Sequence, residues 1–161
     1  MAGEEAYLRK AIDRYAPAIA ALGRTGLAAL RQRFPGARIQ VYERRTSLVM
    51  GLAPAKGSAL FSLVLYPRWV RFFFLEGVAL DDPEGRLEGT GSQVRSIRVD
   101  DGARFDDPYV RRLMAQAVAG ASADLTSGRG AVELRSRLDM TPPPAFRRRG
   151  SVNPRPRGRR R

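Results

Sequence analysis

The sequence predicts an α+β domain, a two-layer sandwich in which a mostly antiparallel β-sheet is packed on one face by N-terminal and C-terminal helices. The first observation behind this prediction is that helical spacing of apolar residues, strand-like alternation and helical spacing again follow one another in blocks. Such blocks favour an α+β domain over alternating βαβ units. The second is size, because 161 residues with a hydrophobic fraction of 43% suit one domain with its own core.

The N-terminal third is expected to be helical. Its apolar residues recur at spacings of four, three, four and three, which is one face of a helix: Leu8, Ile12, Tyr15, Ile19 and Leu22. Pro17 interrupts this pattern, because a proline inside a helix removes a hydrogen bond and clashes with the preceding turn. Two short helices and one kinked helix both fit. The stripe continues from Leu27 until Pro35-Gly36 ends it.

The middle of the chain alternates with a period of two, as strands do. Residues 39–41 and 48–52 carry the first two strand patterns. Ser58–Tyr66 and Trp69–Leu75 are the most strand-like segments, because they are rich in branched and aromatic residues. Only Pro67-Arg68 separates these two segments, so we expect them to pair as a hairpin.

A further strand and a closing helix follow. Asp82-Pro83-Glu84-Gly85 has the chemistry of a type I turn, and it leads towards a strand over Val94–Val99. In the closing helix Asp107 is the expected N-cap and Gly120 the expected end. Residues 131–138 fit either a short strand or a helix.

The last part of the chain differs in composition from the rest. From Thr141 the sequence runs through three consecutive prolines into Arg, Pro and Gly, a mixture that cannot build a core. We therefore expect a single domain over residues 1–138 and a disordered Pro/Arg-rich basic tail over residues 139–161.

Most of the excess positive charge belongs to that tail. The net charge is +13, from 29 basic and 16 acidic residues; residues 141–161 hold eight arginines and no acid, so 21 basic residues remain against 16 acidic ones. Arginine-rich segments attract nucleic acids because neutralised phosphates release counterions. The excess of arginine over lysine also fits a coding bias without a binding role. The predicted nucleic-acid contacts are the arginines of the tail: Arg147, Arg148, Arg149, Arg155, Arg157, Arg159, Arg160 and Arg161.

The stretch Gly-Thr-Gly-Ser-Gln-Val-Arg, residues 89–95, looks at first like a phosphate-binding loop. A dinucleotide site or P-loop needs its glycines between a strand and a helix, whereas a strand follows here and no third glycine or Gly-Lys-Ser/Thr is present. We interpret Gly89 and Gly91 as turn or bulge positions at the entrance to a strand. A backbone nest that binds an anion beside Arg95 is the alternative.

Residues 74–99 resemble the YdhG-like domain family of unknown function. The order of elements extends the resemblance to roughly residues 5–120, and the basic tail is not part of it. The family usually has lysine after Gly-Thr-Gly and histidine after the arginine, where this chain has Ser92 and Ser96. The residues that match as they stand are Gly77, Leu80, Asp82, Pro83, Leu87 through Gly91 and Arg95.

The resemblance implies an antiparallel sheet covered by helices. Some relatives are described as frataxin-like iron chaperones, which implies carboxylate ligands, because iron without Cys or His must be held by oxygen. The candidates are Asp81, Asp82, Glu84 and Glu88, and separately Asp100, Asp101, Asp106 and Asp107. Each group also has a plainer explanation in turns, helix caps and solvated loops, and the chain has no histidine. We therefore assign no metal site.

The chain carries no recognisable catalytic constellation. Histidine and cysteine are both absent, so the commonest general base and the thiol nucleophile are missing. The serines have no activating partner in a known motif, and the paired carboxylates stand in turns rather than in apolar settings that raise a pKa. The sequence does not favour an enzyme, and we expect no cofactor.

The second face of the predicted sheet is unexpectedly apolar. The residues expected to face the helices are Phe61, Leu63 and Leu65 on one strand and Val70, Phe72 and Phe74 on the next. An antiparallel sheet with one solvated face should show polar residues on the alternating set, but aromatic residues stand there instead. The alternating set is Leu60, Ser62, Val64 and Tyr66, with Trp69, Arg71, Phe73 and Leu75 on the second strand, and the candidate binding residues among them are Tyr66, Trp69, Arg71 and Phe73. Either further structure such as residues 121–138 covers this face, or it binds a protein partner, a second copy or a small ligand. In composition it also resembles a stacking platform for single-stranded nucleic acid.

Together these observations predict a cytoplasmic, non-enzymatic binding domain whose sheet face or pocket takes a small ligand or a protein. The N-terminus begins with Met-Ala-Gly-Glu-Glu rather than with a signal peptide, and no apolar run approaches the roughly 20 residues of a membrane span. We therefore expect no membrane association. Non-specific nucleic-acid binding through the tail is the alternative function, iron chaperoning is the third, and the oligomeric state is open.

Overall fold

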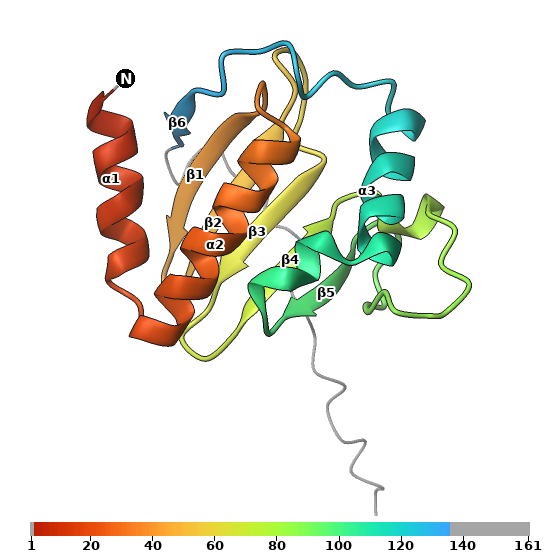
Figure 1. Cartoon of the computed structure of the whole chain (residues 1–161), viewed down its shortest axis with the longest axis horizontal. Coiled ribbons are helices and arrows are strands. Elements are labelled where there is room, and N and C mark those ends of the chain that lie inside the picture. The colour runs from red at the N-terminus through yellow and green to blue at the C-terminus, as the bar shows by residue number, and fades with distance from the viewer. Residues whose placement is uncertain (1, 136–161) are drawn as a thin grey trace, which may run out of the picture.

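The computed structural model describes residues 2–135, and this part of the chain forms three α-helices and a six-stranded sheet. The α+β prediction is confirmed, with the helices on one face of the sheet (Figure 1). The helices are α1 (Ala2–Asp13), α2 (Pro17–Arg33) and α3 (Pro108–Gly120). The strands are β1 (Arg38–Arg44), β2 (Ser47–Ala53), β3 (Phe61–Leu65), β4 (Val70–Phe74), β5 (Arg95–Val99) and β6 (Val132–Leu134), and the 3₁₀ turns are η1 (Gly77–Ala79) and η2 (Gly102–Asp106).

The sheet has the strand order β5-β4-β3-β2-β1-β6. Neighbours from β1 to β5 are antiparallel, and the β3–β4 hairpin forms across Pro67-Arg68 as predicted, with the Tyr66 amide donating to the Trp69 carbonyl over 2.9 Å. The exception is β6, which resolves the ambiguous segment as a strand and pairs in parallel with β1. Figure 1 shows the chain returning from α3 to the opposite edge of the sheet to form it.

The N-terminal helices are two, not one kinked helix. Pro17 occupies the first turn of α2, where its missing amide is not needed. Gly23 and Gly26 lie within this helix at the points where its backbone comes closest to the sheet and to η2, so that a larger residue would clash there. A Cβ atom at Gly23 would come within 2.7 Å of Leu65 Cδ2, and one at Gly26 within 3.0 Å of Phe105 Cε2.

A stack of phenylalanines forms the centre of the main core, between the helices and the sheet. Phe61 contacts Phe34, Phe72 and Phe74 with ring centroids 5.4, 5.4 and 5.7 Å apart, and Phe72 meets Phe105 at 5.2 Å. Aromatic contacts at these separations add to the stability that burial alone provides. The predicted inward set of strand residues belongs to this cluster: Phe61, Leu63, Leu65, Val70, Phe72 and Phe74.

A second, smaller apolar cluster lies on the opposite face of the sheet, as the alternation predicts. Leu60, which the alternation places on this second face, instead packs partly against the main core, because residues 58–60 are a loop rather than the start of β3. The cluster consists of Val49, Val64 and Phe73 with the partly buried Tyr42, Tyr66, Leu75 and Val94.

The segment after α3 does not cover this second face within the described residues. Leu125 and Val132 are buried in the main core cluster, and β6 extends the sheet edge instead of crossing the sheet. The predicted boundary at residue 138 and the predicted disorder of residues 139–161 lie outside the described part. None of the helices within residues 2–135 is long and apolar enough to traverse a bilayer.

Candidate functional site

The four outward-facing residues that the sequence singled out do lie together, along the β3–β4 hairpin. The rings of Tyr66 and Trp69 are tilted against each other at the hairpin end, with centroids 5.9 Å apart. Arg71 stands opposite Val64, and Phe73 stands opposite Ser62 on the neighbouring strand. The alternation of the strands therefore brings together the group that the sequence predicts.

Arg71 is an internal structural cation within this group. Only 8% of the residue is exposed; its Nε donates to Ser96 Oγ over 3.1 Å, and its Nη2 pairs with the Glu88 carboxylate. A buried guanidinium needs such partners because an unpaired buried charge is strongly unfavourable. Glu88 reaches it because residues 88 and 96 form an isolated antiparallel bridge beside β5. The sequence analysis missed this pairing, and a separation of 17 residues gives no periodic signal for it.

The centre of the second face is closed to solvent. Val49, Val64 and Phe73 are only 1%, 3% and 9% exposed, and burial raises the pKa of the Tyr42 and Tyr66 hydroxyls. Base stacking needs an open ring face, and Phe73 does not offer one. Tyr66 and Trp69 at the hairpin end are half-buried. The aromatic residues of the second face therefore expose less ring surface to a ligand than their number in the sequence suggests.

The Gly89–Arg95 loop is closed by its own arginine. Gly89 has φ of +139°, a conformation that favours glycine, and it lies in the loop that precedes β5. The Arg95 Nη1 donates to the carbonyl oxygens of Gly91 and Val94 over 2.6 and 2.8 Å. An anion nest is built from converging amides, whereas the contacts of this guanidinium are carbonyls. The anion-binding alternative for Gly89, Gly91 and Arg95 stays a prediction.

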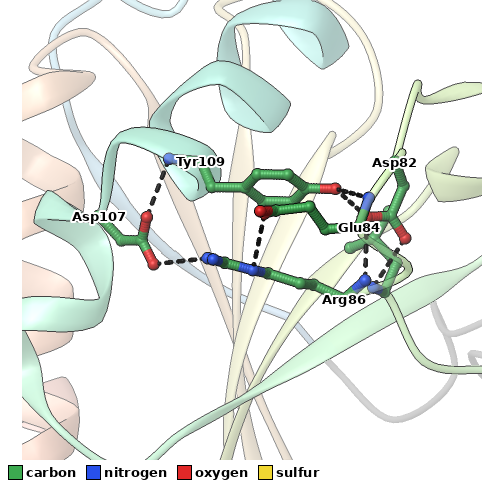
Figure 2. Close-up of polar contacts among 6 residues, drawn as sticks. Asp82, Glu84, Arg86, Asp107 and Tyr109 are labelled. Atoms are coloured by element: carbon green, nitrogen blue, oxygen red, sulfur yellow. Dashed lines mark hydrogen bonds and ion pairs between the residues drawn. The ribbon is translucent and has the colours of Figure 1, made fainter.

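The Asp-Pro turn is fastened to the start of α3 by a polar cluster around Tyr109 (Figure 2). The Tyr109 hydroxyl donates to Asp82 Oδ1 and accepts from the Glu84 amide, which lies 3.0 Å away. Arg86 lies over the Tyr109 ring at 4.4 Å and pairs with Asp107 at 2.9 Å. Asp107 also caps α3 by accepting from the Tyr109 amide, which confirms the predicted N-cap.

The electrostatics of this cluster favour a charged Asp82. Burial alone would raise the pKa of its carboxyl, but hydrogen bonds from the Tyr109 hydroxyl and from the amides of Leu87 and Arg86 outweigh it, so the pKa lies below its usual value. Conversely, burial and the hydrogen bond to Asp82 raise the pKa of Tyr109. The contacts among Asp82, Arg86 and Tyr109 therefore hold the Asp-Pro turn against the start of α3.

The carboxylates named as iron candidates do not converge. Asp82, Glu84 and Asp107 are engaged in the Tyr109 cluster, and Glu88 is paired with Arg71. On the other loop Asp101 caps η2. Within residues 2–135 no three carboxylates come together in a group that could hold a metal ion. Asp82 thus lies in a turn, and Asp101 and Asp107 are the N-caps of η2 and α3.

A groove that the sequence analysis did not anticipate lies between three segments. Its volume is about 970 Å³, and its walls are the β2–β3 loop (residues 54–60), the η1 region (76–80) and the end of α3 with the turn beyond it (116–124). This volume falls in the range of small-molecule sites, about 300–1,000 Å³. The wall from α3 is open because its side chains are small: Ala117, Ala119, Gly120, Ala121 and Ala123.

Defined contacts fix the groove walls. Arg38 at the start of β1 donates to the carbonyls of Pro54 and Gly57, each over 2.8 Å, and so holds the β2–β3 loop. The Asp81 amide donates to Gln116 Oε1 over 2.9 Å, which ties the segment after η1 to α3. The only sequence signal of this site is the run of small residues from Ala115 to Ala123, which leaves space but does not say which segments face it.

The groove combines an apolar floor with a polar rim. Leu60, Leu80 and Ala117 rest on the main core, while Lys56 and Glu76 are exposed at the edge. A mostly apolar surface with a few polar groups is the usual character of a small-ligand site.

No family model matches the chain, and neither a curated protein nor a solved structure is found to match it. The resemblance of residues 74–99 to the YdhG-like family therefore stays a prediction.

Proposed function

We propose that this YdhG-like α+β domain is a cytoplasmic binding protein whose groove between the β2–β3 loop, η1 and the end of α3 takes a small, largely apolar ligand. The groove carries the proposal. Its volume is about 970 Å³, and it is walled by segments that hydrogen bonds hold in place. Pre-formed walls favour binding because little ordering is required when the ligand enters.

The residues that line the groove indicate which class of ligand it can bind. Alanines and leucines favour an apolar body, and the exposed Lys56 at the rim favours an anionic end group. A catalytic role finds no support in the groove, because its ionisable residues, Lys56, Glu76 and Asp124, include no nucleophile and base in contact. Asp124 is occupied instead by hydrogen bonds from Thr126 and the Ser127 amide.

A dye that matches this chemistry tests the proposal. 8-Anilinonaphthalene-1-sulfonate has apolar rings and one sulfonate, so its fluorescence should rise and saturate at one dye per chain. Ala79→Phe places a large side chain at the groove wall, and Ala28→Phe is the control on an exposed position of α2 outside the groove. We expect Ala79→Phe and Lys56→Gln to weaken dye binding and Ala28→Phe to leave it unchanged. Equal binding by both phenylalanine variants would contradict the assignment.

A second function, non-specific association with nucleic acid, is favoured by the eight arginines without any acid in residues 141–161. Binding of labelled single-stranded and duplex nucleic acid at two salt concentrations tests it, in the full chain and in residues 1–140. Neutralised phosphates make affinity fall steeply with salt, so binding should be salt-sensitive and should be lost with the tail. Dye binding in the groove should survive the same deletion, which separates the two functions.

A further inference from the structure

A small polar cavity lies between the end of α2, the start of α3 and η2. Its volume is about 300 Å³, and it shares no lining residue with the groove proposed above as the ligand site. Part of its wall is apolar and buried, and consists of Leu30, Phe105 and Met114. The polar residues that line it are Gln32, Arg33, Asp106 and Arg111.

Two of these residues bring positive charge to the cavity from different helices. Arg33 is half-buried at the last position of α2, and Arg111 is exposed near the start of α3. Burial, and then the positive charge of Arg111, lower the pKa of the Arg33 guanidinium. The two cations are therefore close enough to repel each other, and their approach needs an explanation.

No acid within residues 2–135 neutralises this pair. Asp106 is the only acid in the cavity wall, and among the described residues it forms no ion pair with Arg33 or Arg111. Arg31, two positions before Arg33 on α2, shows the contrast, because its Nη2 pairs with Glu5 Oε1 over 2.5 Å. The donors of Arg33 and Arg111 thus remain available to an incoming group.

The helix ends account for only one of the two arginines. A helix carries partial negative charge at its C-terminal end and partial positive charge at its N-terminal end. Arg33 at the end of α2 is favoured by its own helix, whereas Arg111 near the start of α3 is not. The helices alone therefore do not explain why Arg111 lines the same cavity as Arg33.

We propose that this cavity binds a phosphate group, which Arg33 and Arg111 hold between α2 and α3. A phosphate monoester carries about −1.5 to −2 charges at neutral pH and has three acceptor oxygens, which suits two guanidinium groups. Planar guanidinium groups donate paired, charge-assisted hydrogen bonds to such oxygens. The buried apolar wall strengthens these contacts, because electrostatic attraction is larger where water is excluded. The site is independent of the ligand proposed for the groove and of the nucleic-acid association proposed for residues 141–161.

Titration of the full chain with inorganic phosphate, and separately with phenyl phosphate, tests this site at constant ionic strength. The backbone amide NMR signals of Phe105 and Asp106, which line the cavity, should shift and saturate. The double variant Arg33→Gln and Arg111→Gln should bind about tenfold more weakly or worse, since it loses the charge-assisted hydrogen bonds. The tighter of the two probes distinguishes free phosphate from an organic monoester as the source.

The matched control removes the same charge elsewhere. Arg9→Gln and Arg129→Gln replace two exposed arginines outside the cavity, so this variant should bind phosphate as the parent chain does. Equal affinities of the two double variants would overturn the proposal.

Thermal unfolding gives a second measurement that does not depend on NMR. Ligand binding raises Tm, so phosphate should raise the Tm of the control variant more than that of Arg111→Gln, relative to sodium chloride of the same ionic strength. In chloride alone Arg111→Gln should unfold at the same or a higher temperature than the parent chain, because the repulsion with Arg33 is removed. An equal response to phosphate in Arg111→Gln and the control would contradict the site, and an equally large difference with acetate would contradict the choice of phosphate.

Discussion

Replacing Gly77 with alanine tests whether the close packing of Gly77 in η1 against Arg95 in β5 stabilises the fold. A Cβ atom at Gly77 would lie 2.5 Å from Arg95 Cβ and 2.8 Å from the Arg95 backbone nitrogen. The second contact is to backbone of β5, which a side-chain rotation cannot relieve. The backbone of η1 must therefore move away from β5, or the backbone of Arg95 must shift and carry its guanidinium away from the carbonyls of Gly91 and Val94.

The change in the free energy of unfolding caused by Gly77→Ala is the sum of two opposing effects. Forcing an extra methyl group against packed neighbours typically destabilises a fold by about 1–3 kcal/mol. Against this, alanine restricts the unfolded chain more than glycine does, which stabilises by about 0.4–1 kcal/mol where the backbone accepts it. We expect Gly77→Ala to lower the free energy of unfolding by about 1.3 kcal/mol, the difference between the midpoints of the two ranges.

Urea unfolding followed by Trp69 fluorescence measures this change, with Gly120→Ala as the matched control. Gly120 ends α3, has no heavy atom within 4 Å of its ideal Cβ position and lacks a positive φ, so alanine should be neutral or slightly stabilising there. Amide exchange in residues 91–94 should accelerate in Gly77→Ala only, because the Arg95 contacts hold that loop. If both variants unfolded at the same urea concentration, the structural interpretation of this motif would be refuted.

Three further variants test the packing and the polar cluster. Phe72→Ala should destabilise the domain by about 3–5 kcal/mol, because it removes the ring that contacts Phe61 and Phe105, and calorimetry would show a lower Tm. Tyr109→Phe should lower the urea midpoint more than Tyr7→Phe, since Tyr109 is 8% exposed and Tyr7 39%; equal midpoints would count against a stabilising role for the Tyr109 cluster. The pKa of Asp82 lies below its usual value, so its charge stabilises the fold above the pKa of the unfolded state, and this contribution is lost as pH falls through the lowered pKa. Asp82→Asn should therefore be less stable at neutral pH and show a smaller loss of stability on acidification, and an unchanged acid profile would argue against this carboxylate.

The order and type of the elements could be read from the sequence because each depends on local pattern. Asp107 marked the start of α3, and the two residues after Tyr66 marked the hairpin between β3 and β4, whereas Pro17 indicated either a second helix or a kink and only the structure shows that α2 starts there. The alternation of the strands also placed Phe73 on the face opposite Phe72. Local chemistry decides these features, so a single sequence is enough to predict them.

Features that depend on distant segments could not be predicted in this way. The strand β6 has only three residues, and its parallel pairing with β1 depends on how the chain returns after α3. The partner of Arg71 was missed for the same reason, since Glu88 reaches it only through the bridge to Ser96. The groove likewise needs three segments whose approach no periodicity encodes.

The distribution of charge connects the two proposed functions. Within the described part several arginines are paired with acids at the surface, among them Arg24 with Asp13 and Arg98 with Asp100. Such exposed pairs contribute little to stability, but they neutralise the positive charge of the domain locally. The arginines of residues 141–161 have no acid within that segment. The field that attracts a polyanion should therefore originate mainly in residues 141–161, which hold eight of the +13 net charges, while residues 1–140 hold 21 basic and 16 acidic residues. The groove then selects its ligand by shape and apolar contact, with Lys56 at its rim.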